Sequence, residues 1–207
     1  MTQNILPKRV VLVNGIPASG KSTLTRALSH HFGWPVLTLD SLKEPFMDAF
    51  SPVDRQRNRQ LGCAAYQAIW NIVEQAPASQ VWLIDAWFGF QPRTLLEQGL
   101  KQAGVEEVLE LWLKIEPEVA VARYQARLSQ RLPGHPGAEY LPELRQLAHQ
   151  ARPMALGAVY DVDACAQDHA AVIHWLQQQL TRIRYTSAHH QRSEELQDVV
   201  APVSANR

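Results

Sequence analysis

Short apolar runs alternate along the chain with longer segments in which apolar residues recur every three or four positions. The runs are typical of parallel strands buried on both faces, and the longer segments are typical of amphipathic helices. Strands are expected at residues 10–13, 36–39, 81–84, 108–115 and, less clearly, 158–162. Helices are expected at residues 21–32, 54–75, 92–103, 116–131, 141–151 and 167–180. This alternation predicts a three-layer α/β/α sandwich around a mostly parallel five-stranded sheet.

The same pattern sets the expected domain limits. A chain of 207 residues suits one domain with its own hydrophobic core. Residues 1–183 carry the strand and helix signals and are predicted to form that domain. Residues 184–207 are polar and show no periodicity. We expect them to form a flexible tail.

Charge and cysteine content narrow the function classes. The chain holds 20 Lys and Arg against 20 Asp and Glu, so it lacks the basic field of a nucleic-acid-binding protein. Its two cysteines, Cys63 and Cys165, lack CxxC spacing and are expected to be reduced thiols. No apolar run approaches the ~20 residues of a membrane span. We therefore expect a cytoplasmic protein, a monomer or homodimer, without nucleic-acid or membrane partners.

A glycine-rich loop follows the first predicted strand. Its sequence, GIPASGKS at residues 15–22, fits the phosphate-binding pattern G-x-x-x-x-G-K-[ST] between a strand and a helix. Backbone N–H groups of such a loop surround a phosphate, the lysine bridges the β- and γ-phosphates, and the serine hydroxyl binds Mg²⁺. We assign nucleotide binding to Gly15, Ile16, Pro17, Ala18, Ser19, Gly20, Lys21, Ser22 and Thr23. Lys21 is also a candidate catalytic residue, and Ser22 a candidate metal ligand.

Two aspartates follow the second and third predicted strands. Ligands of parallel sheets gather at the carboxyl ends of the strands, so both carboxylates are expected near the phosphates. Asp40 has two interpretations: a base that accepts the proton of an attacking hydroxyl, or the N-cap of the next helix. Asp85 ends an apolar strand, as a Walker-B carboxylate does, which predicts second-shell binding of Mg²⁺ through water or Ser22. A substrate contact and a purely structural role for Asp85 remain open.

Residues beside these aspartates are candidates for acceptor binding. Lys43 lies one helical turn after Asp40 and could pair with it or contact an anionic substrate. Trp87 and Phe88 follow Asp85 on a rim loop, where aromatic faces could stack on a substrate. We therefore expect Asp40, Lys43, Trp87 and Phe88 to contact the acceptor.

Three arginines recur every four residues in the segment RYQARLSQR. This spacing would place Arg123, Arg127 and Arg131 along one side of the helix predicted at residues 116–131. One interpretation is a solvated face. The other is a closing lid over about residues 123–140, whose arginines neutralise charge on a transferred phosphoryl group. Arg127 and Arg131 are candidate catalytic residues, Arg123 a candidate nucleotide contact, and His135 a weaker candidate contact.

Together these motifs resemble the small P-loop kinases of the nucleoside-monophosphate-kinase type. Within that type the chain is similar to the group that contains gluconate kinase, chloramphenicol phosphotransferase and zeta-toxin-like kinases. The resemblance rests on GIPASGKS, LTLD, VWLIDAWF and the arginine segment with GHPG after it, and it covers about residues 9–180. It implies strand order 2-3-1-4-5, a mobile lid, and ATP with Mg²⁺ as phosphate donor. Asp85 departs from the group because Ala86 follows it where relatives often have Glu-Gly.

The expected function is therefore an ATP-dependent phosphotransferase that acts on a hydroxyl of a small molecule, such as a sugar, a sugar acid or an antibiotic-like compound. One alternative is a nucleotide-dependent switch or binding ATPase, although the chain has no N-K-x-D guanine motif and no ABC signature. Another is a toxin-like kinase that acts on a nucleotide sugar or an RNA end. The sequence leaves the acceptor unnamed.

Overall fold

The computed structural model of the chain describes residues 7–166 and 168–181. The predicted tail at 184–207 lies outside the described residues. The chain divides into two compact units, Met1–His169 and Ala170–Arg207. In the second unit the described residues, 170–181, are helical, close to the predicted helix at 167–180. That one domain extends to residue 183 stays a prediction.

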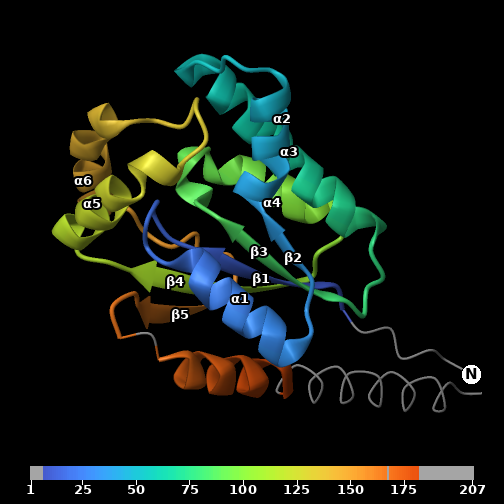
Figure 1. The fold of residues 1–207 in the computed structure, drawn as a ribbon. Coiled ribbons are helices and arrows are strands. Elements are labelled where there is room, and N and C mark those ends of the chain that lie inside the picture. The colour runs from blue at the N-terminus through green and yellow to red at the C-terminus, as the bar shows by residue number, and fades with distance from the viewer. Residues whose placement is uncertain (1–6, 167, 182–207) are drawn as a thin grey trace, which may run out of the picture. The chain divides into compact units, whose positions relative to one another are not determined.

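Five strands form one all-parallel sheet in the first unit. Their order is β2-β3-β1-β4-β5, as the resemblance implied. Figure 1 shows the strands fanned around β1 at the centre. The strands are β1 (Arg9–Asn14), β2 (Val36–Thr38), β3 (Val81–Ala86), β4 (Glu107–Lys114) and β5 (Ala158–Asp163). The predicted α/β fold class is confirmed.

Among the described residues up to 166, six α-helices connect or follow these strands. They are α1 (Lys21–Phe32), α2 (Leu39–Ala49), α3 (Arg55–Gln75), α4 (Arg93–Gln102), α5 (Pro117–Ala126) and α6 (Leu141–Gln150). Short 3-10 turns are η1 (Phe88–Phe90), η2 (Leu128–Gln130) and η3 (Ala138–Tyr140). Local signals explain several boundaries: Gly33 ends α1 in the left-handed conformation, and Asp54 caps α3 through the Arg57 N–H.

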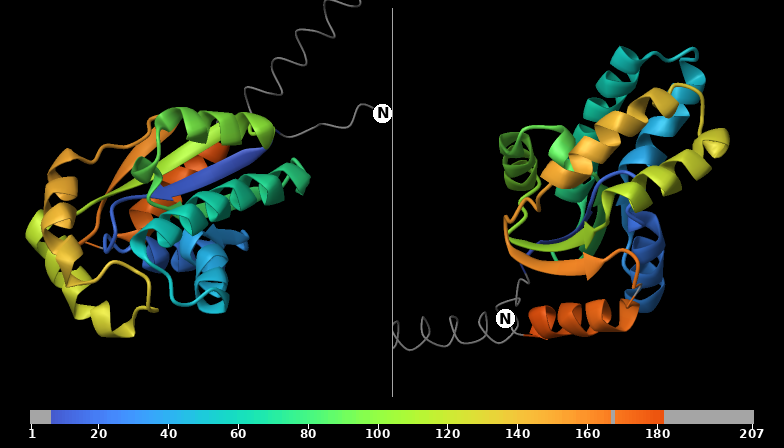
Figure 2. Two further views of the ribbon diagram at one scale, coloured as in Figure 1. Left: turned by 90° about the horizontal axis from the view of Figure 1, so that it is seen from above. Right: turned by 90° about the vertical axis from the view of Figure 1, so that its left-hand side faces the viewer.

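The main hydrophobic core lies between the sheet and helices α3 and α4. Val10 and Leu12 of β1 and Ile84 of β3 pack there against Ile69 and Trp70 of α3. Helix α1 packs on β1 and β3 from the opposite face, so the sheet is covered on both sides (Figures 1 and 2). Burial on both faces explains why the central strands are continuous apolar runs in the sequence.

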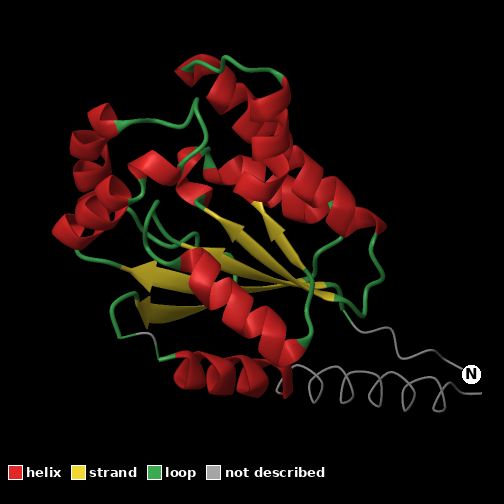
Figure 3. Cartoon of the chain, in the orientation of Figure 1, coloured by secondary structure: helices red, strands yellow, loops and turns green. Residues whose placement is uncertain are grey.

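A buried polar pair fixes the loops at the carboxyl edge of the sheet. The Asn14 side chain donates to Glu110 Oε1 at 2.7 Å and accepts from the Phe88 N–H at 3.2 Å. Glu110 also accepts from the backbone N–H groups of Met154 and Ala155. The loops after β1 and β3 and the segment before β5 are thereby anchored to one another. Figure 3 shows these loops and the helix starts that follow the strands.

No helix among the described residues is long and apolar enough to cross a membrane.

Candidate functional site

The loop between β1 and α1 has the backbone geometry of a phosphate cradle. Gly20 precedes α1 with φ of 95°, and Ala18 is also left-handed with φ of 68°. Left-handed residues in such a loop turn successive N–H groups toward one concave side, where an anion can bind. Gly15 must lack a side chain, because a Cβ there would meet Ser19 Oγ at 2.6 Å. Helix α1 adds its positive dipole end to the same place.

Only some of the predicted nucleotide-binding residues line the large cavity. Three residues of the loop do not line the large cavity: Gly15, Ile16 and Ser19. Ile16 and Ser19 are buried. The members that line the large cavity above the loop are Pro17, Ala18, Gly20, Lys21, Ser22 and Thr23.

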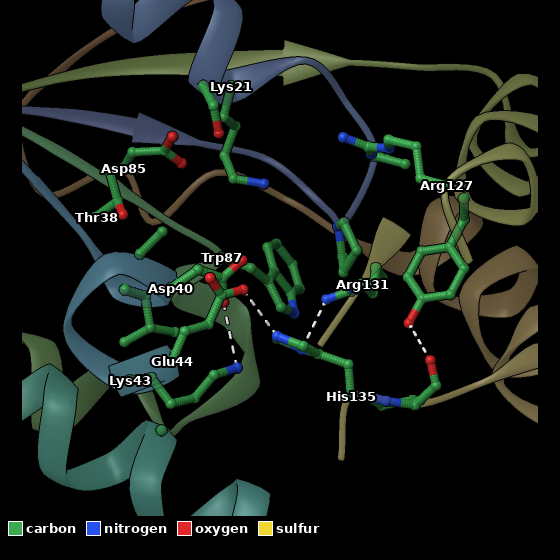
Figure 4. A pocket seen from close by; sticks show the side chains of 18 of the residues that line it. Lys21, Thr38, Asp40, Lys43, Glu44, Asp85, Trp87, Arg127, Arg131 and His135 are labelled. Carbon is green, nitrogen blue, oxygen red and sulfur yellow. Dashed lines mark hydrogen bonds and ion pairs between the residues drawn. The ribbon is translucent and has the colours of Figure 1, made fainter. Parts of the chain in front are cut away.

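Lys21 folds back over the loop. Its Nζ donates to the carbonyl oxygens of Gly15 and Ile16 at 2.9 and 3.0 Å. Burial lowers the pKa of this lysine, and the nearby carboxylates of Asp85 and Asp40 oppose that shift. The ammonium is thus held at the cavity wall between the loop and two carboxylates (Figure 4).

Asp85 lies near the end of β3 and faces the phosphate-binding loop. Its side chain is 5% exposed and pairs with the Ser22 hydroxyl. Burial raises the pKa of Asp85, and Lys21 and Ser22 act in the other direction. Its Oδ2 is buried without a hydrogen-bond partner among the described residues. An unpartnered buried carboxylate oxygen beside a serine hydroxyl is a donor set that suits Mg²⁺.

Asp40 lies in the first turn of α2 rather than at the end of β2. Strand β2 ends at Thr38, whose side chain caps α2 by accepting from the Ser41 N–H at 2.9 Å. The N-cap interpretation of Asp40 is therefore wrong. The reason is that Thr38, like Asp, has a side-chain oxygen that can cap a helix.

The Asp40 carboxylate pairs with Lys43. Lys43 Nζ lies 3.2 Å from Asp40 Oδ1; the lysine side chain is 8% exposed and the aspartate side chain 56%. Burial raises the pKa of Asp40, but the charges of Lys43 and Arg131 hold it below its usual value. Asp40 is therefore ionised at neutral pH and open to the cavity.

The arginine segment is not one continuous helix. Helix α5 ends at Ala126, Arg127 is its C-cap with φ of −102° and ψ of 0°, and Arg131 is extended. The prediction of a helical stripe over 116–131 is wrong. Pro133 restricts Leu132 and would stop a helix there, but the break comes earlier, at Arg127, where the chain turns into η2.

The three arginines consequently have different environments. Arg127 and Arg131 line the large cavity, while Arg123 lines a second cavity and donates to the Ala164 carbonyl at 3.3 Å. The Arg131 guanidinium lies 4.8 Å from the centroid of the Tyr124 ring and contacts His135 Nδ1 at 2.8 Å. The structure therefore brings Arg127 and Arg131 to the phosphate-binding loop, but not as neighbours on a helix.

Trp87 and Phe88, the two aromatic residues expected on the rim loop, lie in different environments. Trp87 is half-buried and lines the cavity, but Phe88 is 1% exposed and packs in the core against Tyr66. The 3-10 turn η1 directs Phe88 inward and leaves Phe90 at the cavity wall. The structure therefore does not bring Phe88 to the cavity. Phe90 lies at the cavity wall, where Phe88 was expected.

The large cavity has a volume of about 600 Å³ and unites these groups. Its wall carries more cationic than anionic side chains, as an anionic ligand requires. The cationic ones are Lys21, Arg26, Lys43, Arg55, Arg59, Arg127 and Arg131, and the anionic ones are Asp40, Glu44 and Asp85. The second cavity, about 380 Å³, lies along Gly20, Thr23, Arg123 and Asp163.

Sequence reasoning missed several residues of the cavity wall. One of them is Glu44, whose Oε1 lies 2.9 Å from Nε2 of His135, itself a weaker candidate, although the two are 91 residues apart. Asn58 and Gly62 of α3 line the same wall. No local pattern distinguishes these residues from an ordinary helix surface, apart from a glycine in the interior of a long helix.

Comparisons with known proteins find similarity in structure only. No family model matches the chain, and no curated protein matches its sequence. A protein from Chloroflexus aurantiacus proposed to be a kinase matches with a TM-score of 0.67 and 24% identity, over 83% of this chain and 97% of its own. A sugar kinase from a Janibacter species matches with a TM-score of 0.55 and 21% identity, over 84% and 95%. Shikimate kinase from Bacteroides thetaiotaomicron matches with a TM-score of 0.54 and 19% identity, over 84% and 98%.

Proposed function

We propose that the chain transfers the γ-phosphoryl group of ATP to a hydroxyl of a small molecule. One observation carries the proposal: a single cavity joins the phosphate-binding loop with Lys21, the Asp40–Lys43 pair, and the arginines Arg127 and Arg131. A nucleotide switch would need the loop, but would not need a carboxylate held ionised opposite it. The structural neighbours named as sugar and shikimate kinases support the same reaction class.

The donor side would hold the nucleotide. The N–H groups of the loop and Lys21 would bind its phosphates, and Arg123 with the second cavity would take the nucleoside end. Ser22 and Asp85 would hold Mg²⁺, which when bound offsets negative charge on the phosphates. Arg127 and Arg131 are the cationic groups available for the charge of the transferred phosphoryl group.

The acceptor side would hold a hydroxyl next to Asp40. As the bond between that oxygen and the γ-phosphorus forms and the bond from the phosphorus to the bridging oxygen of ADP breaks, the Asp40 carboxylate takes the hydroxyl proton. Lys43 keeps Asp40 ionised and fixes its Oδ1, so the carboxylate is ready as a base at neutral pH. Trp87 and Phe90 supply the apolar wall on which the body of the acceptor would rest.

Within this reaction class, we place the chain with the gluconate kinase, chloramphenicol phosphotransferase and zeta-toxin-like group. That placement rests on the loop, the aspartate after β2 and the arginine segment.

Replacement of the proposed base tests the function. ATP consumption is measured with a panel of sugars, polyols, sugar acids, and phenicol- and aminoglycoside-like compounds. With the acceptor found in this way, Asp40→Asn is expected to lower kcat about 10²–10⁴-fold, because general-base catalysis typically contributes that much. Asp48→Asn is the matched control: Asp48 is an exposed aspartate later in the same helix.

Two results would contradict the proposal. If no compound of the panel raises ATP consumption above the rate in water, acceptor phosphorylation of this class is not the function. If Asp40→Asn keeps full turnover, Asp40 is not the base. Because the pKa of Asp40 is lowered, protonation of this carboxylate should reduce the rate only well into the acidic range.

A further inference from the structure

His135 is a buried histidine that connects the lid loop to helix α2. Its Nδ1 lies 2.8 Å from Arg131 Nη2, and its Nε2 lies 2.9 Å from Glu44 Oε1 (Figure 4). The imidazole is 2% exposed although it lies at the wall of the large cavity. A lid arginine is thus linked through one ring to the helix that carries Asp40.

The partners determine the protonation state of this ring. A guanidinium has only donors, so the nitrogen that faces Arg131 must accept, and Nδ1 therefore carries no proton. The Glu44 carboxylate has only acceptors, so Nε2 must donate to it. His135 is consequently neutral with its proton on Nε2. A second proton on Nδ1 would put two donors face to face and break the contact with Arg131.

The surrounding contacts hold the loop in this position. Asn58 Nδ2 of α3 donates to the carbonyl oxygen of Gly134, next to His135. The Tyr124 hydroxyl of α5 donates to the carbonyl oxygen of Pro136 at 2.8 Å, on the other side of His135. The backbone that carries His135 is therefore tied to two helices, and the ring has a fixed place from which to direct Arg131.

A metal ion does not account for this cluster. Asp40, Glu44 and His135 offer ligand atoms within 4.8 Å of one another, which a divalent cation could bridge. However, Lys43 already pairs with Asp40 at 3.2 Å, and Arg131 already takes the free nitrogen of His135. Two cations that are part of the protein neutralise this cluster, and a third positive charge would be repelled.

We propose that neutral His135 is a positioning residue, which holds the Arg131 guanidinium in the cavity and couples it through Glu44 to the helix that carries Asp40. The inference rests on the proposed function, in which Arg131 meets the transferred phosphoryl group. It assigns to His135 a role that depends on its Nδ1 acceptor and not on its bulk.

Neighbouring charges keep the ring neutral. Burial, Lys43 and Arg131 lower the pKa of His135, while Asp40 and Glu44 raise it, and the net pKa lies below the usual value. The contributing charges come from α2 and the lid loop, and α3 offers the uncharged Asn58 to this loop. Protonation should therefore need a more acidic solution than it does for an ordinary histidine, and it would release Arg131.

Two substitutions separate the two ring nitrogens. The oxygen of His135→Asn can replace Nδ1 as the acceptor for Arg131, whereas the amide of His135→Gln can replace Nε2 as the donor to Glu44. Preference for the γ-phosphate is measured as the ratio of the Kd for ADP to that for the imido analogue of ATP, both with Mg²⁺. His135→Gln and Arg131→Gln should reduce this ratio by a similar factor, on the order of tenfold for a lost hydrogen-bonded charge.

The double variant and the pH dependence complete the test. His135→Gln with Arg131→Gln should lose no more than Arg131→Gln alone, because both changes remove one contact. On acidification the ratio should fall further in the unchanged protein than in His135→Asn, which has no ring to protonate. His30→Asn, an exposed histidine of α1, is the matched control and should behave as the unchanged protein.

The tautomer gives a readout that does not depend on nucleotide. Nitrogen NMR of the full chain should show His135 protonated on Nε2 and unprotonated on Nδ1 at pH 7. A proton on Nδ1, or an unaltered nucleotide ratio in His135→Gln, would overturn the inference alone. Failure of the unchanged protein to bind either nucleotide would overturn the proposed function, and the inference with it.

Discussion

The two ends of the large cavity are built in opposite ways. The phosphate-binding loop at the donor end is one contiguous segment, residues 15–23, and Lys21 bonds to carbonyl groups five and six residues before it. The acceptor end comes from α2, α3, η1 and the lid loop, and its contacts join residues as much as 91 positions apart. A local sequence motif therefore forms the phosphate-binding loop of the donor end, whereas packing between distant segments forms the acceptor end.

This difference predicts how each end responds to change. Substitutions at the donor end should affect binding and transfer of any phosphate, whatever the acceptor is. Substitutions at the acceptor end should affect one substrate selectively, or act through the position of the lid. The following predictions test that division, beginning with the largest effect.

Removal of the Lys21 charge should have the largest effect of this series. Lys21→Met keeps most of the side-chain length but loses the ammonium that bonds to the loop. We expect kcat to fall about 10²–10³-fold with every acceptor, as when one preorganised donor is removed from a transition state. Steady-state kinetics with at least two acceptors would measure this, and Lys101→Met, an exposed lysine of α4, is the control. A loss confined to one acceptor would contradict the division.

The same division explains what could be predicted from the sequence. The positions of the strands and the start of α1 at Lys21 followed from apolar runs and a contiguous motif, both of which are local signals, whereas the strand order came from the resemblance to P-loop kinases. The helix over residues 116–131 was predicted from a four-residue spacing, but α5 ends at Ala126 and a 3-10 turn follows it. Spacing shows which residues could share a face, and it does not show where the helix ends.

The acceptor end was harder to predict because its side-chain directions depend on distant contacts. Phe88 and Phe90 are equivalent in the sequence, and only the position of η1 against α3 sends Phe88 into the core. Glu44 and His135 meet only because the lid loop reaches α2. No periodicity encodes either outcome. Tertiary packing decides both.

A methyl group at Gly62 should affect the acceptor end alone. A Cβ there would lie 3.9 Å from Lys43 Cδ and 3.9 Å from Phe90 Cε2, so alanine fits without a clash and narrows the cavity. Gly62→Ala is expected to raise the acceptor KM about tenfold, the lower end of the roughly 10–200-fold effect of a methylene-sized change in a pocket. The KM for ATP should stay unchanged.

The same substitution should stabilise the folded chain. Alanine is favoured over glycine in a helix interior by about 1 kcal/mol, and Gly62 lies well inside α3. Thermal unfolding of Gly62→Ala and of the unchanged chain would measure this gain. An equal rise in the KM values for ATP and acceptor would show that the two ends of the cavity are not independent.

The smallest effect is expected at the cap that places Asp40. Thr38 Oγ1 accepts from the Ser41 N–H at 2.9 Å, and Ser41 Oγ donates back to the Thr38 carbonyl at 3.0 Å. Thr38→Ala should lower the free energy of unfolding by about 1 kcal/mol, the usual cost of a lost N-cap. Thr38→Ser keeps the oxygen and should recover most of this loss, as urea unfolding would show. Because the cap orients the first turn of α2, the acceptor kinetics should change while the affinity for ADP does not. An equal loss of stability in both variants would mean that the Thr38 methyl group, and not the cap, holds the start of α2.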